Sequence, residues 1–280
     1  MSEDIMIKTY FVDGDKGGVG KSFAARAIAD MLMQSARFKL PKPIRQLLVV
    51  DADESNQDVC GDGGFPEIET VNGCNVRGMF APISTPQQWV QAGDRVFDAI
   101  PQWGDDEGRV VFSLPAGAGL AIAKAAEVTA VMEALNAVHV WVIGTDAGSV
   151  EQLQQRIDAF PAFYQQGFVI RNLRHGVADD FTHWNKSATR AAVKDWGWQE
   201  IDLPVLTPSV ASDLARTPLH IAERDKASTN GKKLGLGSQV SVKTFRGIAG
   251  DRLAALERFT PKMSAELSAD VSTNPNGAFA

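Results

Sequence analysis

The sequence has only two cysteines among 280 residues, Cys60 and Cys74. They lie fourteen positions apart, no Cys-x-x-Cys pair occurs, and no histidine stands at a ligand spacing from either one. A disulfide framework or a zinc site is therefore not expected, and a reduced cytosolic protein is the prediction.

Long apolar runs are also lacking. Residues 1–8 carry acidic side chains and no apolar core, which argues against a secretory signal. The most apolar stretch, Gly119–Gly144, is interrupted by Lys124, Glu127 and Glu133. A membrane-spanning helix needs about 20 consecutive, mostly apolar residues. We therefore expect this stretch to form a buried helix followed by a strand.

Basic charge is scarce, since 28 Lys and Arg stand against 34 Asp and Glu, a net charge of −6. This balance argues against a protein that coats nucleic acid with its whole surface. The charge is uneven, however: residues 51–107 carry a local net charge of −10, and residues 214–263 one of +6. The second region could hold phosphate backbones without reading sequence, or it could simply be a solvated basic surface.

Hydrophobic residues make up 44% of the chain and charged residues 22%, which is typical of a globular protein. Apolar runs that suit buried parallel strands alternate with helical patterns. The expected strands are Ile7–Asp13, Gln46–Ala52, Arg109–Leu114, Val138–Gly144 and Gly167–Asn172. The expected helices are Lys21–Ser35, Leu120–Ala137, Val150–Phe160, Asp180–Trp196 and Thr244–Phe259. This order predicts an α/β fold, a doubly wound and mostly parallel sheet with helices on both faces.

The domain organisation is expected to be simple. No linker divides the chain, so residues 1–263 are predicted to form a single domain. Residues 53–106 are rich in glycine, proline and acids and are expected to be loop-rich, while residues 264–280 resemble a disordered tail.

The strongest motif is Asp13–Ser22, which reads D-G-D-K-G-G-V-G-K-S between an expected strand and an expected helix. Glycines let backbone N–H groups point inward around a phosphate, and the helix N-terminus adds a partial positive charge. Lys21 can reach the β- and γ-phosphates, and the Ser22 hydroxyl can bind Mg²⁺. The motif predicts an ATP site, and the expected nucleotide-binding residues are Gly17, Gly18, Val19, Gly20, Lys21, Ser22 and Phe23.

The general G-x-x-x-x-G-K-[ST] pattern would need a glycine where Asp15 stands. The loop instead fits the variant K-G-G-x-G-K-[ST], in which Lys16 is an extra lysine. In this it resembles the deviant Walker A P-loop ATPases of the ParA/MinD family, over roughly residues 5–225. The resemblance implies that Lys16 and Lys21 act in catalysis, with Lys16 reaching the partner's nucleotide in an ATP-bound homodimer. Asp15 departs from the family, which usually has glycine there.

Two carboxylates follow the second expected strand, in the order Asp51-Ala52-Asp53. The carboxyl end of a strand in an open α/β sheet faces the ligand crevice, and alternate residues share a face. The pair resembles the D-x-D segment of the family. The resemblance implies that Asp53 orients the attacking water and that Asp51 supports the Mg²⁺ shell. The alternative is a solvated acidic loop after a core strand.

Three further positions are compared with the family. Ser113 stands where the Walker B aspartate is usual, and a serine brings no charge to the metal, so we expect slow hydrolysis. Asn172 resembles the strand-end asparagine that contacts adenine, although it could be only a turn residue. Pro208 resembles the loop that packs against the base. Asp146 is expected to cap a helix and not to act as a catalytic acid.

Other branches of this superfamily fit less well. Cys60 and Cys74 do not match the cysteines of the iron–sulfur carriers, and Tyr10 and Tyr164 do not form the tyrosine-rich tail of the tyrosine kinases. The run Lys21-Ser22-Phe23 is similar to plasmid mobilisation and stability ATPases.

The function predicted from the sequence is therefore that of a cytosolic ATPase that dimerises with ATP. It would bind non-specific DNA through residues 214–263 and an adaptor protein, for plasmid or chromosome partition, mobilisation or cargo positioning. The alternative is a nucleotide-gated interaction module with little hydrolysis, such as a conjugation accessory or membrane-positioning factor. A small-molecule ligase is a third interpretation.

Overall fold

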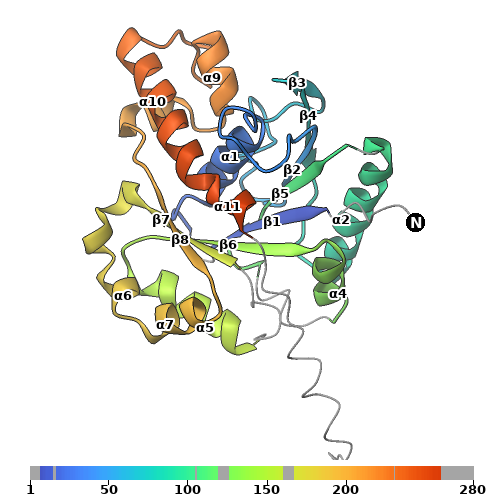
Figure 1. The fold of residues 1–280 in the computed structure, drawn as a ribbon, viewed down its shortest axis with the longest axis vertical. Coiled ribbons are helices and arrows are strands. Elements are labelled where there is room, and N and C mark those ends of the chain that lie inside the picture. The colour runs from blue at the N-terminus through green and yellow to red at the C-terminus, as the bar shows by residue number, and fades with distance from the viewer. Residues whose placement is uncertain are drawn as a thin grey trace, which may run out of the picture.

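The computed structural model describes residues 7–14, 17–104, 106–118, 126–159, 167–229 and 231–259. An eight-stranded sheet crosses the molecule in the order β3-β4-β2-β5-β1-β6-β7-β8 (Figure 1). All neighbouring strands are parallel except β3 and β4. The strands are β1 (Lys8–Asp13), β2 (Gln46–Asp51), β3 (Glu69–Val71), β4 (Cys74–Phe80), β5 (Gly108–Ser113), β6 (Ala137–Ile143), β7 (Gly167–Asn172) and β8 (Gln199–Leu203).

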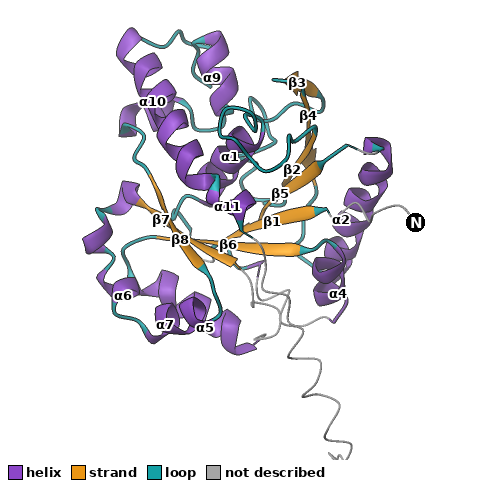
Figure 2. Ribbon diagram, viewed as in Figure 1, coloured by secondary structure: helices purple, strands orange, loops and turns teal. Residues whose placement is uncertain are grey.

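Helices cover both faces of this sheet, as Figure 2 shows in purple against the orange strands. One face carries α1, α8, α9, α10 and α11, and the other carries α2 and α4 at one end and α5, α6 and α7 at the other. The helices are α1 (Lys21–Leu32), α2 (Pro86–Ala99), α4 (Ala126–Ala134), α5 (Ala147–Ala159), α6 (Thr182–Asn185), α7 (Ala188–Asp195), α8 (Pro208–Asp213), α9 (Leu219–Asp225), α10 (Leu236–Leu253) and α11 (Ala255–Arg258).

The continuous apolar runs of the central strands follow from this arrangement. On β1, Tyr10 and Val12 belong to the core under α1 and α10, whereas Phe11 packs against Trp89 of α2. Because successive side chains point to opposite faces, a strand covered on both sides must be apolar at every position. The predicted doubly wound, mostly parallel α/β fold is confirmed.

The prediction of a loop-rich region over residues 53–106 is wrong from residue 69 onward, where the chain forms β3, β4 and α2. Strand β4 was obscured because it alternates buried and exposed residues and contains Gly78. Helix α2 begins with a capping box, in which the Thr85 side chain accepts from the Gln88 backbone and the Gln88 side chain accepts from the Thr85 backbone. The short edge strand β8 was also not predicted.

Two predicted helices differ in extent. The helix expected over Asp180–Trp196 is split into α6 and α7, because Ser187 caps a new helix by accepting from the Arg190 backbone N–H at 3.0 Å. The helix expected over Thr244–Phe259 starts earlier, at Leu236, and is followed by the separate α11. The expected tail at 264–280 lies outside the described residues.

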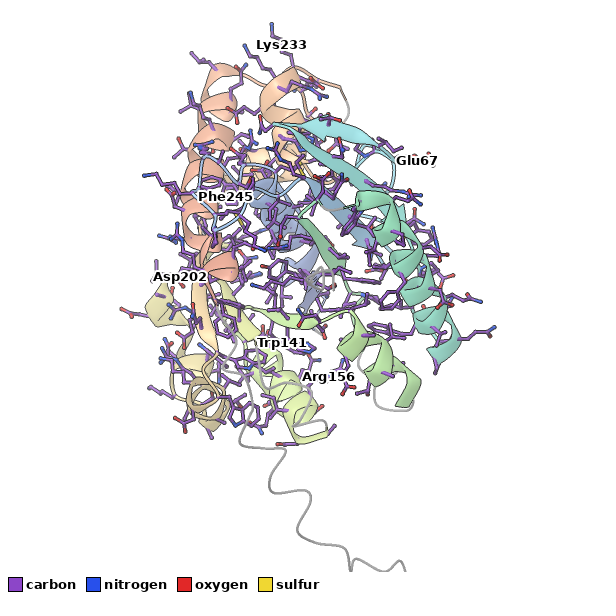
Figure 3. All side chains as sticks on the ribbon, turned by 45° about the vertical axis from the view of Figure 1, so that its right-hand side comes forward. Glu67, Trp141, Arg156, Asp202, Lys233 and Phe245 are labelled. Carbon is purple, nitrogen blue, oxygen red and sulfur yellow. The ribbon has the colours of Figure 1, made fainter. Side chains whose placement is uncertain are left out.

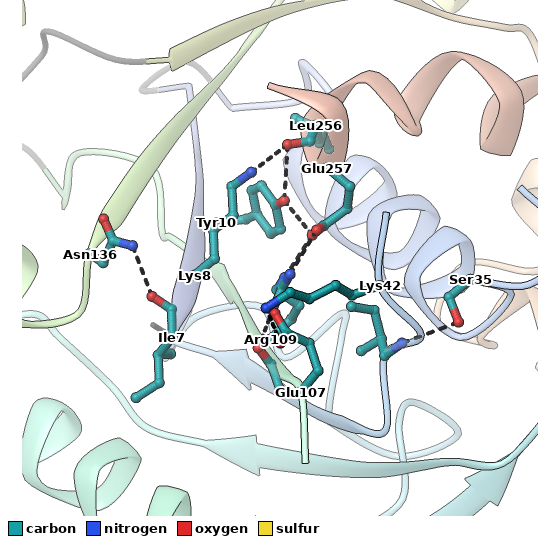
Figure 4. A network of polar contacts seen from close by, with 12 residues as sticks. Ile7, Lys8, Tyr10, Ser35, Lys42, Glu107, Arg109, Asn136, Leu256 and Glu257 are labelled. Carbon is teal, nitrogen blue, oxygen red and sulfur yellow. Dashed lines mark hydrogen bonds and ion pairs between the residues drawn. The ribbon is translucent and has the colours of Figure 1, made fainter. Parts of the chain in front are cut away.

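A buried polar network joins α11 to the amino ends of β1 and β5 (Figure 4). Arg109 donates to both carboxylate oxygens of Glu257 at 2.8 and 2.9 Å, and the Tyr10 hydroxyl donates to the same carboxylate at 2.6 Å. Burial opposes the charge of Glu257, but its hydrogen bond and attraction to Arg109 outweigh burial and lower its pKa. The network anchors the last described helix at the end of the sheet opposite the phosphate loop.

Glycine on α10 allows close packing of this helix, and its replacement tests the arrangement. A Cβ at Gly250 would lie 2.0 Å from the ring of Phe38, whereas a Cβ at Gly237 of the same helix meets nothing within 4 Å. Gly250→Ala is expected to lower the free energy of unfolding by about 1–3 kcal/mol through overpacking. Gly237→Ala should be neutral or stabilising by up to about 1 kcal/mol. Urea denaturation measures both, and equal stability of the two variants would contradict the packing of α10 on Phe38.

Candidate functional site

The glycine-rich loop between β1 and α1 has a backbone that depends on glycine. Gly18 and Gly20 have φ angles of +83° and +98°, in the left-handed region that side chains rarely adopt. Gly20 is also the residue before α1, and no side chain caps this helix. The first N–H groups of α1 are therefore available to an anion. Asp15 and Lys16 lie outside the described residues.

Asn172, at the end of β7, holds this loop in place. Its Nδ2 donates to the Val19 carbonyl at 2.8 Å, and its Oδ1 accepts from the Arg174 backbone N–H at 3.2 Å. A Cβ at Gly20 would come within 2.4 Å of Nδ2, so Gly20 is required for space as well as for its φ angle. Asn172 is only 2% exposed. Asn172 therefore supports the loop and also lines the cleft in front of it, and its contact with adenine stays a prediction.

A cleft of about 380 Å³ lies in front of the loop, within the size range of small-molecule sites. Most of the predicted residues line it: Gly17, Gly18, Gly20, Lys21, Ser22, Phe23, Asp53 and Asn172. Val19 is instead buried in the core, with its carbonyl bound to Asn172. Pro208 is exposed as the first residue of α8 and is not part of the lining. The segment after β8 contributes Pro204 and Leu206 in its place.

The two carboxylates after β2 have different surroundings. Asp51 is 1% exposed, and its carboxylate accepts from the backbone N–H groups of Val59, Cys60 and Asp53 at 2.8, 3.0 and 3.3 Å. Burial raises the pKa of Asp51 although these N–H groups favour its charged form. Asp53 lines the cleft, and its Oδ1 accepts from the backbone N–H groups of Ser55 and Asn56. Asp51 therefore ties down the loop, and Asp53 is the carboxylate that faces the cleft.

The residues fit a Mg²⁺ ion that arrives with a nucleotide. Across the described residues, no group of three or more His, Cys, Asp or Glu side chains is placed to hold a metal by itself. Mg²⁺ bound with a nucleotide is usually coordinated by several water molecules, by phosphate oxygens and by one or two oxygens of the protein. The Ser22 hydroxyl and the Asp53 carboxylate both line the cleft and could supply these. Ser113 is 1% exposed, pairs with Asp51 in the sheet register and does not line the cleft.

Sequence reasoning missed part of the lining. The additional residues are Arg26, Asn56, Asp58, Ala116, Arg174, Pro204, Leu206, Ala211, Ser212 and Ala215. Arg26 could have been found, because it lies one helical turn after Ser22 and so shares its face of α1. An adjoining hollow of about 520 Å³ shares Asp53, Asn56 and Ala116 with the cleft.

A glycine-rich loop that leaves the central strand of a parallel sheet and opens a helix at a Lys-Ser pair defines the P-loop nucleoside triphosphatase fold. No protein-family model matches the chain. It is 26% identical over 250 residues to protein MobD of Acidithiobacillus ferrooxidans, covering 86% of this chain and 93% of MobD.

Solved structures with a similar fold include three that were determined with nucleotides or partners. MinD in the MinC:MinD cell division complex of Aquifex aeolicus is 14% identical, covering 87% of this chain and 96% of that chain, with a TM-score of 0.45. The McdA–ATP complex of Cyanothece is 13% identical (87% and 95% covered, TM-score 0.44). A putative plasmid partition protein of Borrelia burgdorferi bound to AMPPNP is 12% identical (90% and 99% covered, TM-score 0.42).

No helix in the described ranges combines the length and the hydropathy of a membrane span.

Loss of the Asn172 side chain should loosen the phosphate loop. Asn172→Ala removes one buried and one partly buried hydrogen bond and is expected to cost about 1–3 kcal/mol of stability. It should also weaken ATP binding about tenfold, because the loop must then be ordered by the ligand. Thermal denaturation and an ATP titration measure the two effects.

Asn185→Ala is the matched control, because the Asn185 side chain also donates to a backbone carbonyl, that of Ala178 at 2.9 Å, but does not line the cleft. It should lower stability and leave ATP affinity unchanged. Equal ATP affinity in the two variants would show that Asn172 does not support the loop.

Proposed function

We propose that the protein is a cytosolic ATPase of the ParA/MinD type, which binds ATP with Mg²⁺, dimerises in that state and acts on DNA and a partner protein in partition, mobilisation or cargo positioning. The observation that carries this proposal is the preformed phosphate loop. Gly18 and Gly20 hold the required backbone, Asn172 supports it, and Lys21 and Ser22 line the cleft in front of it.

The chemistry proposed for the cleft is positioning and neutralisation of charge, which phosphoryl transfer mainly requires. Lys21 would hold the β- and γ-phosphates, and Ser22 would bind the Mg²⁺ that neutralises them. Asp53 would orient the attacking water from the facing loop. Ser113 adds no charge at the end of β5, so we expect slow turnover. This serine also favours the second candidate, a nucleotide-gated interaction module that hydrolyses little ATP.

A second copy of the chain would close the site on its open side. The hollow next to the cleft shares Asp53 with it and is bounded by the α2 N-terminus at Thr85 and Pro86. A face-to-face dimer would cover this surface, and Lys16 of each copy would reach the nucleotide of the other. ATP would then be part of the interface, which explains why dimerisation should depend on it.

Some basic residues of the region 214–263 are already paired within the protein and are not available to bind DNA. Arg246 is buried and forms ion pairs with Asp30 and Glu223, and Arg224 pairs with Glu69 and Asp225. These arginines stabilise the packing of α9 and α10. Four exposed lysines have no ion pair with any described residue within 4.0 Å: Lys226, Lys232, Lys233 and Lys243. Figure 3 shows Lys233 projecting from the end of the molecule, and we propose this lysine group as the DNA-binding surface.

Sedimentation with and without ATP tests the proposal as a whole. The wild-type protein should shift from monomer to dimer with ATP and Mg²⁺. Lys21→Ala should weaken ATP binding by about a hundredfold or more, the effect of losing charge-assisted hydrogen bonds to phosphate. Lys16→Ala should bind ATP normally and stay monomeric, and Asp53→Ala should accumulate as the ATP dimer.

Unchanged ATP affinity in Lys21→Ala would refute the assignment of the phosphate loop. Release of phosphate above background separates the two candidate functions, because the interaction module predicts tight binding without release. A dimer that forms equally well without ATP would instead favour the ligase interpretation.

DNA binding by the lysine group predicts a change in salt dependence. Each phosphate contact contributes about −0.9 to the slope of log K against log salt concentration, so Lys232→Ala/Lys233→Ala should reduce the slope by about 2. Lys39→Ala/Lys186→Ala removes two exposed lysines elsewhere and should leave the slope unchanged. Fluorescence anisotropy with a non-specific duplex at several salt concentrations measures this, and equal slopes in the two double variants would exclude the surface.

A further inference from the structure

Arg26 is a buried cation in the wall of the nucleotide cleft. It lies on α1, is only 4% exposed and is part of the cleft lining. Its Nη1 donates to the carbonyls of Leu214 and Thr217 at 2.8 and 3.2 Å, and its Nε donates to the carbonyl of Ser22 at 3.4 Å. One side chain therefore joins the helix that follows the phosphate loop to a segment almost 190 residues further along the chain.

The two distant carbonyls belong to the segment that follows α8. This short helix and its C-terminal end supply Ala211, Ser212 and Ala215 to the cleft, on the wall that faces α1. Leu214 is the C-cap of α8, and carbonyls at such a helix end have no partner within the helix and carry partial negative charge, whereas Thr217 lies between α8 and α9. The planar guanidinium donates from Nη1 to these two carbonyls and from Nε to a third, that of Ser22, and a lysine has no second nitrogen for this arrangement. The position of this wall thus depends directly on Arg26.

Arg26 forms no ion pair within 4.0 Å with a described carboxylate, and Asp58 and Asp51 act on its charge without such a pair. Burial lowers the pKa of Arg26 to about 10, so that it is still protonated at neutral pH. A buried charge without an ion pair is costly unless a ligand or hydrogen bonds compensate it. A polyanion in the cleft would add negative charge to that of Asp58 and Asp51.

An aromatic contact extends the connection to α10. The guanidinium of Arg26 lies over the ring of Phe23, 5.6 Å from its centroid, and Phe23 packs on Phe245 of α10 with ring centroids 5.2 Å apart. Phe23 lines the cleft immediately after Ser22. The side chain of Arg26 is therefore held by α1 and by the segment that follows α8, and Phe23 connects it to α10.

We propose that Arg26 is a positioning residue for a nucleoside polyphosphate. It fixes the wall formed by residues 211–217 at the distance that the bound nucleotide requires, and it offsets part of the ligand's negative charge. This role rests on the proposed function of the cleft, because it needs a nucleotide there. It adds to that proposal a residue outside the phosphate loop that sets affinity without taking part in phosphoryl transfer.

Titration with the fluorescent analogue mant-ATP in the presence of Mg²⁺ tests the role. Arg26→Met keeps an unbranched apolar stem and removes the donors and the charge, so affinity should fall about tenfold, the effect of losing hydrogen bonds to a charged group. Arg26→Lys keeps the charge without the planar fork and should weaken binding about threefold. In steady-state hydrolysis, KM should rise while kcat is unchanged, because binding in the ground and transition states is affected equally.

Arg109→Met is the control for general destabilisation. Arg109 is as deeply buried, at 6% exposure, but it lies at the amino end of β5 and pairs with Glu257. It should lower the melting temperature at least as much as Arg26→Met and leave the affinity for mant-ATP unchanged. If Arg26→Met does not fold, the threefold effect of Arg26→Lys is the test.

The outcomes separate the two proposals. Wild-type protein that fails to bind mant-ATP would refute the proposed function. Wild-type protein that binds, with unchanged affinity in the folded Arg26 variants, would refute only the role of Arg26. A loss of affinity in Arg109→Met equal to that in Arg26→Met would show that Arg26 acts through stability alone.

Discussion

The hydrogen bond from Asn172 to the carbonyl of Val19 is the contact on which the site depends. It crosses from the end of β7 to the loop after β1, two positions away in the sheet, with β6 between them. The loop that it holds contains glycines in left-handed conformations and a helix start without a side-chain cap. Such a segment has few contacts of its own, so an outside support is needed to keep its N–H groups directed at one point.

Polar residues stabilise the fold at one end of the sheet and surround the cleft at the other. At the amino ends of β1 and β5, the pair of Arg109 and Glu257 with Tyr10 forms a closed, buried network that anchors α11. At the carboxyl ends, Asp51 binds the backbone of the loop that carries Asp53, and Arg26 fixes the wall formed by residues 211–217. Polar groups at this end are arranged around a cleft, as expected for the ligand side of an open α/β sheet.

The central strands, the phosphate loop and the cap of α5 could be predicted because each shows a pattern within one continuous stretch of sequence. The apolar runs of the five central strands identified them because both faces of each strand are covered, and Asp146 caps α5 as expected, accepting from the Ser149 backbone N–H at 3.2 Å. The Gly-Lys-Ser sequence located the loop because its chemistry lies in consecutive residues. Strands β4 and β8 were missed because they lie toward the edges of the sheet, where burial is incomplete. The T-P-Q-Q sequence at Thr85 could have revealed α2 through its capping box.

The roles of Asn172, Asp51 and Arg26 could not be read from the sequence in the same way. Each role depends on a contact between segments that only the fold brings together. The partners are backbone N–H and carbonyl groups, which every residue carries, so the sequence does not single them out. From the sequence alone, an asparagine at a strand end fits a base contact, a turn or a support equally well. The fold adds its hydrogen bonds to the Val19 carbonyl and the Arg174 N–H, and the adenine contact stays a prediction. The same holds for the wall at residues 211–217, whose apolar and small residues carry no motif.

Amide hydrogen exchange with and without ATP and Mg²⁺ tests the central claim, that the loop is a nucleotide site supported by Asn172 and faced by the wall after α8. We expect slower exchange with ATP over residues 17–23 and 211–217, and no change at the amino ends of β1 and β5. Unchanged exchange in the loop at saturating ATP, or protection confined to other parts of the chain, would contradict it.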